Sequence, residues 1–194
     1  MRAVAVLAFA LLVSGCAHAG RALRAPAPGA TAPSLATTTA PGQTTAAIPI
    51  ALASTAFDPG GLIPIEHTCD GAGVSPPLTW GAVPESTVEL AITVTDPDAG
   101  FVHWVIANLS PTVQALATGV VPDDAVQAKN TSGTVGWTGP CPPKGSAPHH
   151  YVFTLYALTA PSGVTADMSG QDAVAAISNV PGLTATLIGS YQRA

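Results

Sequence analysis

The amino-acid sequence predicts a mostly β fold, an antiparallel β-sandwich with one or two short helices. Two observations favour this fold class. The 194 residues include 19 Gly and 19 Pro, which favour turns and loops over long helices. The apolar segments are short and recur at short spacing, without a regular alternation of strands and helices. A chain of this length fits one domain plus appendages.

Five segments carry a strand signal and one carries a helix signal. Residues 88–95 (Val-Glu-Leu-Ala-Ile-Thr-Val-Thr) alternate weakly and are rich in β-branched side chains, which is typical of a strand. Similar signals predict strands over residues 47–52, 103–109, 151–158 and 184–191. Residues 172–179 are predicted to form a helix, with Ser169 or Gly170 as its cap.

The N-terminus has the features of a bacterial lipoprotein signal. Arg2 supplies a short positive region, and residues 3–13 form an apolar run that is too short to span a bilayer. Residues 12–16 (Leu-Val-Ser-Gly-Cys) resemble the lipobox, in which small residues precede a Cys that becomes acylated. We therefore expect residues 1–15 to be a signal peptide and Cys16 to be lipidated.

A flexible tether is predicted between this signal and the folded domain. Residues 16–47 are rich in Ala, Pro, Thr and Gly and lack apolar periodicity, so they cannot bury enough surface to offset chain entropy. Residues 48–194 form the predicted domain, held on the extracytoplasmic side of the bacterial cell membrane by the lipid anchor. An ordinary signal peptide cleaved after Ala17 or Ala19 is the alternative.

The charge of the predicted domain excludes one class of partner. Only 9% of the residues are charged, against about a quarter in typical proteins. From residue 48 onward there are three Lys and Arg residues and all eleven Asp and Glu residues, and three minus eleven gives −8. A nucleic-acid-binding protein needs a basic surface that neutralises phosphates. We therefore expect no nucleic-acid partner.

The first segment whose side chains could bind a ligand or catalyse a reaction is Asp96-Pro97-Asp98, at the end of the strand predicted over residues 88–95. Because Pro stops ladder pairing, both carboxylates should lie at the end of the sheet. Asp beside Pro is also ordinary turn chemistry. His103 and Trp104 open the next strand, where consecutive side chains face opposite sides, so if one reaches a pocket the other packs or faces outward. A neighbouring Asp would favour the imidazolium form of His103, which can hold an anion.

The second segment is residues 139–145 (Gly-Pro-Cys-Pro-Pro-Lys-Gly), followed closely by His149-His150-Tyr151. Three prolines fix φ and lack N–H donors, while the glycines permit close approach of a ligand or of backbone. The segment therefore cannot be a helix or a central strand. It is either a rigid surface loop or, together with the first segment, part of a small pocket for an anion or a polar headgroup.

These segments resemble the signature motifs of the phosphatidylethanolamine-binding protein family, and in particular its bacterial, Raf-kinase-inhibitor-like branch. The matching motifs are Asp96-Pro97-Asp98-Ala99, His103-Trp104, residues 139–145, and His149-x-Tyr151. An upstream stretch with Cys69-Asp70-Gly71, Ser75-Pro76-Pro77-Leu78 and Trp80 resembles the entry loop of that branch. The similarity covers roughly residues 56–193.

The resemblance implies an antiparallel β-sandwich with a preformed pocket that accepts phosphate, phosphorylethanolamine or acetate-like groups. It places four side chains in the polar lining: Asp96, His103, His149 and Tyr151. It places three residues in the backbone rim: Gly139, Pro142 and Pro143. Trp80 matches no pocket residue. No cofactor, metal or catalytic residue is implied.

The cysteines become informative once this family is considered. Cys16 belongs to the lipobox, and two cysteines left over in an exported domain invite a disulfide. The resemblance brings the loops of Cys69 and Cys141 near the pocket, so we expect a Cys69–Cys141 disulfide.

The sequence departs from the family pattern in three places. Gly100 replaces the second proline of the usual Asp-Pro-Asp-Ala-Pro motif, which predicts a softer pocket wall. The connection from Asp98 to His103 is shorter than in the eukaryotic members. His150 replaces an Arg at a position that strand alternation points away from the pocket, so we expect a structural effect and not a loss of binding.

The favoured functional hypothesis is a membrane-anchored binding protein for a small anionic or phospholipid-headgroup ligand, with inhibition of a partner enzyme as a further expectation. The alternative is a hydrolase with Cys141 as nucleophile and His149 or His103 as base. An Asp/His/His metal site is a variant of that alternative, but it lacks a metal-binding spacing motif. A third hypothesis is an interaction domain for a protease or another envelope protein, with a vestigial pocket.

Overall fold

The structure is a computed structural model that describes residues 50–194. The predicted signal peptide, Cys16 and the predicted tether lie outside the described residues. The long strands are β3 (Glu89–Asp96), β4 (Phe101–Leu109), β7 (His149–Leu158) and β8 (Gly182–Tyr191). The short elements are β1 (Leu52–Ala53), β2 (Leu78–Trp80), β5 (Ala115–Leu116), β6 (Val126–Gln127), the 3₁₀ helix η1 (Ile65–His67) and the helix α1 (Gly170–Ser178).

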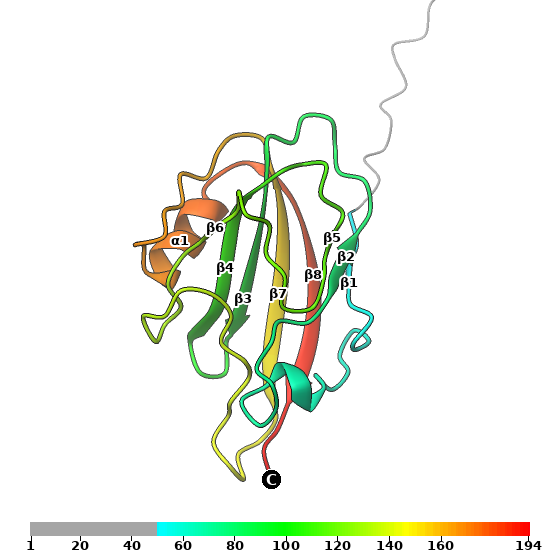
Figure 1. The fold of residues 1–194 in the computed structure, drawn as a ribbon, viewed down its shortest axis with the longest axis vertical. Coiled ribbons are helices and arrows are strands. Elements are labelled where there is room, and N and C mark those ends of the chain that lie inside the picture. Colours follow the sequence, from blue (N-terminus) through cyan, green and yellow to red (C-terminus); the bar gives the residue numbers. More distant parts are fainter. Residues whose placement is uncertain (1–49) are drawn as a thin grey trace, which may run out of the picture. The chain divides into compact units, whose positions relative to one another are not determined.

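The strands form two antiparallel sheets, as the sequence predicts. The larger sheet has the order β6-β4-β3-β7-β8 and the smaller one has the order β1-β2-β5. Figure 1 shows the smaller sheet on one side of the larger sheet and α1 on the other side. Each face of the larger sheet therefore has its own apolar core.

The core between the sheets contains Leu78 and Trp80 from the smaller sheet and Ile92, Val94 and Phe153 from the larger one. Trp80 is only 6% exposed, which agrees with its having no match among the pocket residues.

On the opposite face, Ala173 and Ile177 of α1 pack on Ala91, Val105 and Ala107. Full burial of a side chain such as Ile177 contributes about 1.5–3 kcal/mol. The side chain of Ser169 caps α1 by accepting a hydrogen bond from the backbone N–H of Asp172, and Gly170 is the first helical residue.

The four long strands and the helix are confirmed. Of the strand predicted over residues 47–52, residues 47–49 lie outside the described residues, and among residues 50–52 only Leu52 lies in a strand. Within the described residues β1 begins only at Leu52, and it makes two pairs, Leu52 with Trp80 and Ala53 with Thr79. Beyond these pairs the hydroxyl of Ser54 donates to the carbonyl of Pro77, which has no N–H to extend the ladder. The sequence gives no signal for β2, β5 and β6, because strands this short contain no detectable alternation.

A β-bulge in β4 directs the side chain of His103. The pairing of β4 with β3 steps from Val94–Trp104 to Thr95–Val102, so His103 is an extra residue on its strand. Trp104 packs in the core between the sheets, and Val102 packs in the core under α1. The bulge therefore interrupts the alternation on which the expectation for His103 and Trp104 rests. Trp104 nevertheless packs in the core, as the expectation allowed.

Candidate functional site

A cavity of about 240 Å³ lies at the end of the larger sheet where β3 ends and where β4 and β7 begin. It brings together all seven residues that the resemblance placed in the pocket: Asp96, His103, Gly139, Pro142, Pro143, His149 and Tyr151. Five further residues line it that sequence reasoning did not assign to it: Ala99, Phe101, Ser132, Thr138 and Cys141. Phe101 lies two residues before the bulged residue His103, and Thr138 directly precedes the proline-rich loop, but neither has a residue type that indicates a ligand.

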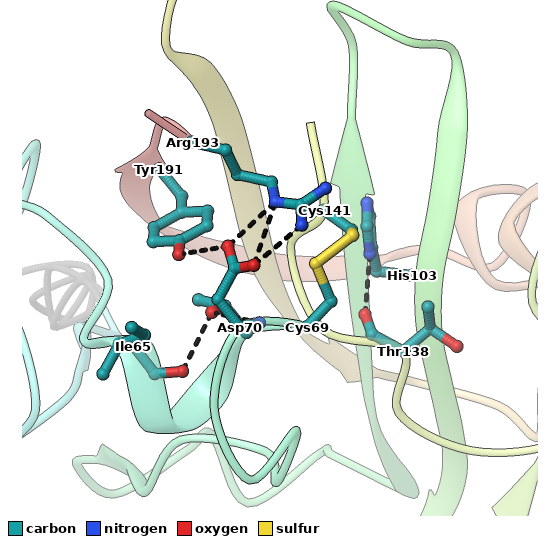
Figure 2. The surroundings of a disulfide bond; sticks show 9 residues. Ile65, Cys69, Asp70, His103, Thr138, Cys141, Tyr191 and Arg193 are labelled. Carbon is teal, nitrogen blue, oxygen red and sulfur yellow. Dashed lines mark hydrogen bonds and ion pairs between the residues drawn. A yellow bond between two sulfur atoms is a disulfide. The ribbon is translucent and has the colours of Figure 1, made fainter. Parts of the chain in front are cut away.

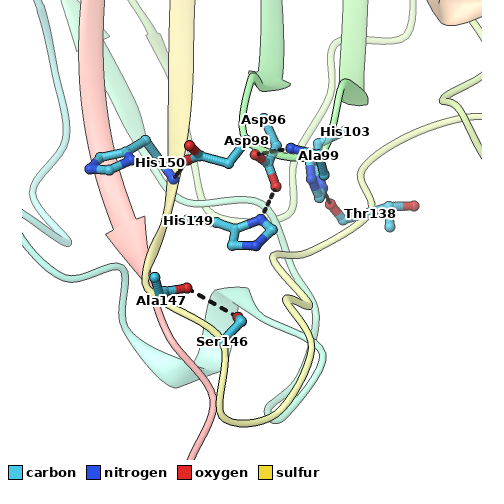
Figure 3. Close-up of polar contacts among 9 residues, drawn as sticks. All are labelled: Asp96, Asp98, Ala99, His103, Thr138, Ser146, Ala147, His149 and His150. Atoms are coloured by element: carbon cyan, nitrogen blue, oxygen red, sulfur yellow. Dashed lines mark hydrogen bonds and ion pairs between the residues drawn. The ribbon is translucent and has the colours of Figure 1, made fainter.

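Asp96 ties the turn after β3 to the start of β7. Its Oδ2 atom accepts a hydrogen bond from Nδ1 of His149 at 2.7 Å, and its Oδ1 atom accepts one from the backbone N–H of Ala99 at 3.1 Å (Figure 3). The carboxylate is only 3% exposed. Asp96 therefore serves both predicted roles, since it stabilises the turn and lines the cavity.

His103 is held in one tautomer. Its Nδ1 atom lies 2.7 Å from the backbone oxygen of Thr138, and a carbonyl oxygen only accepts, so Nδ1 carries the hydrogen. The Nε2 atom of His103 is buried and has no hydrogen-bond partner within residues 50–194. Burial lowers the pKa of His103 and outweighs the opposite effects of the Thr138 carbonyl and the Asp96 carboxylate. The neighbouring Asp96 raises the pKa of His103, as expected, but desolvation is the larger effect, so the net shift disfavours the imidazolium.

Tyr151 supplies the second buried polar atom. Its hydroxyl has no partner within the described part of the chain, and its ring meets the ring of His103 edge-on at 5.1 Å. Burial, followed by the negative charge of Asp96, raises the pKa of Tyr151 far above its usual value. The phenol therefore stays protonated at every physiological pH and can donate a hydrogen bond.

The proline-rich loop forms part of the cavity wall and is attached to the loop that follows η1. Cys69 and Cys141 form the expected disulfide, with their Cα atoms 5.4 Å apart (Figure 2). The backbone N–H of Cys69 also donates to the carbonyl of Pro140 at 3.1 Å. A Cβ atom at Gly139 would lie 2.7 Å from the backbone oxygen of His67, so this close approach of two loops requires glycine.

The C-terminal residues support the same wall. Arg193 donates from Nε and Nη2 to both carboxylate oxygens of Asp70, and the hydroxyl of Tyr191 donates to Asp70 as well (Figure 2). The backbone N–H of Gly145 donates to the carbonyl of Arg193 at 3.0 Å. The cavity wall is therefore tied to two other segments of the chain and is largely preformed.

The comparison with known proteins assigns the family. The family model described as phosphatidylethanolamine-binding protein matches residues 53–192. The chain belongs to the phosphatidylethanolamine-binding protein family. It is 38% identical over 197 residues to the Mycobacterium tuberculosis protein named "Putative lipoprotein LppC", covering 98% of this chain and 94% of that protein.

Two solved structures of the family agree with the fold. The Escherichia coli protein YbcL has a TM-score of 0.71 and 33% sequence identity, covering 76% of this chain and all of that one. The Chlamydia trachomatis protein CT736 has a TM-score of 0.69 and 36% identity, covering 75% of this chain and 99% of that one. Among residues 50–194, no helix is both long and apolar enough to cross a bilayer.

Two departures from the phosphatidylethanolamine-binding protein pattern have a structural explanation. Gly100 does not line the cavity and has a φ of 63°, which proline cannot adopt. The Gly therefore changes the backbone of the turn and does not remove part of the wall. His150 lies outside the cavity, where its backbone N–H and Nδ1 donate to Oδ2 of Asp98 at 2.7 and 2.9 Å (Figure 3). The His150 backbone N–H is the main cause of the lowered pKa of Asp98.

The cavity offers little to the hydrolase alternative. Cys141 is half of a disulfide and so has no thiolate that could act as a nucleophile. Within residues 50–194, no group of three His, Cys, Asp or Glu side chains is arranged to hold a metal ion. What the cavity presents instead is hydrogen-bonding chemistry, with two imidazoles, one carboxylate and one phenol.

Proposed function

We propose that this member of the phosphatidylethanolamine-binding protein family binds a small anionic or phospho-headgroup ligand in the cavity between Asp96, His103, His149 and Tyr151. One observation carries the proposal. Of the four buried side-chain polar atoms without a partner in residues 50–194, two belong to cavity residues, namely Nε2 of His103 and the hydroxyl of Tyr151. A buried polar atom without a partner costs about 1–3 kcal/mol, so a ligand that supplies the partner recovers this free energy.

The size and rigidity of the cavity support a small ligand. A volume of about 240 Å³ is below the range of about 300–1,000 Å³ typical of sites for drug-sized ligands, which suits a phosphate or a headgroup better than an acyl chain. The disulfide and the proline-rich wall limit the entropy that is lost on binding. Phe101 adds an apolar side to the cavity.

The test is a titration of the full chain with phosphorylethanolamine, followed by isothermal titration calorimetry and by NMR of the imidazole groups. We expect saturable binding and chemical-shift changes at His103 and His149, while the exposed imidazole of His150 serves as the internal control. Shifts confined to His150, or no saturable heat, would contradict the proposal.

We also propose that the protein is anchored to the cell membrane through a lipid on Cys16. The lipobox at residues 12–16 supports this, as does the similarity to the protein named "Putative lipoprotein LppC". Metabolic labelling with a fatty acid is expected to mark the wild-type protein and not Cys16→Ser. Equal labelling of the two proteins would contradict the anchor without affecting the proposed ligand site.

A further inference from the structure

We infer that the cavity selects oxyanions that retain an acidic proton, namely phosphate monoesters and inorganic phosphate as monoanions, over phosphodiesters and sulfate. The inference rests on the proposed function and deepens it, because it specifies which phosphate chemistry the site accepts. It also separates two sources of the same headgroup, since an intact phospholipid is a phosphodiester and a released headgroup is a phosphate monoester.

The geometry around His103 makes its ring an acceptor. The hydrogen on Nδ1 is committed to the carbonyl of Thr138 at 2.7 Å, and that oxygen cannot donate in return. In the neutral ring Nε2 therefore has a lone pair and no hydrogen. This atom is buried and has no partner within residues 50–194, so the group that satisfies it must be a donor.

The other titratable groups that line the cavity are consistent with a ligand that donates a hydrogen bond to Nε2 of His103. They are Asp96 from β3 and His149 and Tyr151 from β7. Asp96 is buried and accepts hydrogen bonds from His149 and Ala99, so its carboxylate offers further acceptors and no donor. The Tyr151 hydroxyl is a donor without a partner within residues 50–194, and the ring that carries it meets the ring of His103 edge-on. The cavity therefore pairs an unused acceptor with an unused donor.

A second proton on His103 would remove this selectivity, and burial opposes it. Desolvation lowers the pKa of His103 despite the neighbouring charge of Asp96, and this lowered pKa favours the neutral ring. An oxyanion without a proton would place an oxygen lone pair against the lone pair of Nε2. Otherwise His103 would have to bind a second proton when the oxyanion binds, and charging this buried ring costs free energy.

Phosphate monoesters can satisfy both the acceptor on His103 and the donor on Tyr151. Their second pKa is about 6, so a large fraction retains a P–OH group at mildly acidic pH. The P–OH group can donate to Nε2 of His103, and another phosphate oxygen can accept from the hydroxyl of Tyr151. The phosphate group of a phosphodiester and the sulfate ion have only acceptor oxygens at this pH, and a buried site built around one hydrogen bond rejects analogues that lack it.

The experiment compares four ligands on the full chain by isothermal titration calorimetry at about pH 6 and about pH 7.5. The ligands are phosphorylethanolamine, inorganic phosphate, glycerophosphorylethanolamine and sulfate. We expect the first two to bind at least about tenfold more tightly than the last two. We also expect the affinity for phosphorylethanolamine to fall about tenfold at the higher pH, because less of the monoanion remains.

Nitrogen-15 NMR of the histidine rings gives a second readout that needs no variant. In the phosphorylethanolamine complex Nε2 of His103 should keep the chemical shift of an unprotonated acceptor.

A His103→Gln variant, whose amide can donate, is expected to bind sulfate more tightly than the wild type does. The matched His150→Gln variant should retain the wild-type preference, since His150 lies outside the cavity.

The outcomes separate the inference from the proposed function. Binding of sulfate or glycerophosphorylethanolamine as tight as that of phosphorylethanolamine overturns the inference and leaves the proposed function standing. A doubly protonated His103 in the complex also overturns the inference. If none of the four ligands binds, the proposed function fails and the inference fails with it.

Discussion

Nδ1 of His149 lies 2.7 Å from Oδ2 of Asp96, which is 53 positions earlier in the chain. Two residues further along the turn, Asp98 accepts from both the backbone N–H and Nδ1 of His150. Asp96, the last residue of β3, and Asp98 in the turn after it thus hold consecutive residues at the start of β7. The inner pair, Asp96 and His149, lines the cavity. The outer pair, Asp98 and His150, faces solvent, and the side-chain exposures are 3% for Asp96 and 43% for Asp98.

This difference in burial predicts different consequences of losing each carboxylate. Asp96→Asn removes a buried charge-assisted hydrogen bond, and we expect the free energy of unfolding to fall by about 1–3 kcal/mol. Asp98→Asn is the matched control and should have a smaller effect, because solvent screens the exposed pair. Urea denaturation of both variants measures the difference. An equal loss in the two variants would contradict the role assigned to the inner pair.

The lowered pKa of His103 predicts a pH-dependent stability. In the unfolded chain this histidine takes up a proton near pH 6.5, whereas in the folded protein burial keeps it neutral to a lower pH. Protons are then bound preferentially by the unfolded state, so stability should fall as the pH drops below about 6.5 and continue to fall until the folded pKa is reached. One such group contributes at most about 1.4 kcal/mol per pH unit.

Denaturant unfolding of the wild type and of His103→Gln between pH 5 and about pH 7 tests this linkage. The variant should lose less stability on acidification, since its amide does not titrate. His150→Gln is the control, because it makes the same substitution outside the cavity. If His103→Gln and the wild type have the same pH dependence, the proposed burial effect on His103 is absent.

The unpaired hydroxyl of Tyr151 predicts opposite effects on stability and binding. Tyr151→Phe keeps the buried ring but removes a polar atom that has no partner within residues 50–194, so stability should be unchanged or higher by about 1–2 kcal/mol. The affinity for phosphorylethanolamine should fall about tenfold, because the ligand loses a donor. Thermal unfolding and calorimetry measure the two effects. A large loss of stability with unchanged affinity would show that the hydroxyl is structural. Tyr156→Phe is the control, since Tyr156 packs in the core under α1.

The backbone conformation at Gly100 predicts that replacing this glycine lowers the stability of the fold, without any steric clash of the new side chain. Its φ of 63° is strained for residues with a Cβ atom, and no heavy atom lies within 4 Å of the position that a Cβ would take. Gly100→Ala should therefore lower the free energy of unfolding by about 1 kcal/mol, and Gly100→Pro should lower it further. Gly81→Ala is the matched control, because Gly81 has the same open surroundings without a positive φ. A Gly100→Pro protein as stable as the wild type would rule out this conformation of the turn.

Much of the fold was predictable because its long elements carry local signals. The strand β3 is a nearly continuous buried run that includes β-branched residues, the strand β7 buries alternate residues along much of its length, and Ser169 is an ordinary helix cap. The short strands β1, β2 and β5 were not predictable in detail, since two or three residues contain no periodicity. The bulge at His103 was also missed, because alternation can be read from a sequence only where the strand pairs regularly.

The residues of the candidate site likewise divide into those that the sequence indicates and those that it does not. Asp96, His149 and Tyr151 could be selected from motifs that combine unusual residue types with prolines. Thr138 could not be selected, because it contributes a backbone carbonyl, a group that every residue has. Phe101 and Ser132 line the cavity without any feature that distinguishes them in the sequence.

The sequence by itself determined the class of fold, the family motifs and the acidic, imidazole and phenol groups available to the site, because these follow from residue type and spacing. Only the tertiary structure decided which tautomer His103 adopts and which of its atoms remains unpaired. The physical reason is that the protonation of a buried imidazole depends on its desolvation and on a carbonyl 35 positions away, and both arise only when the chain has packed.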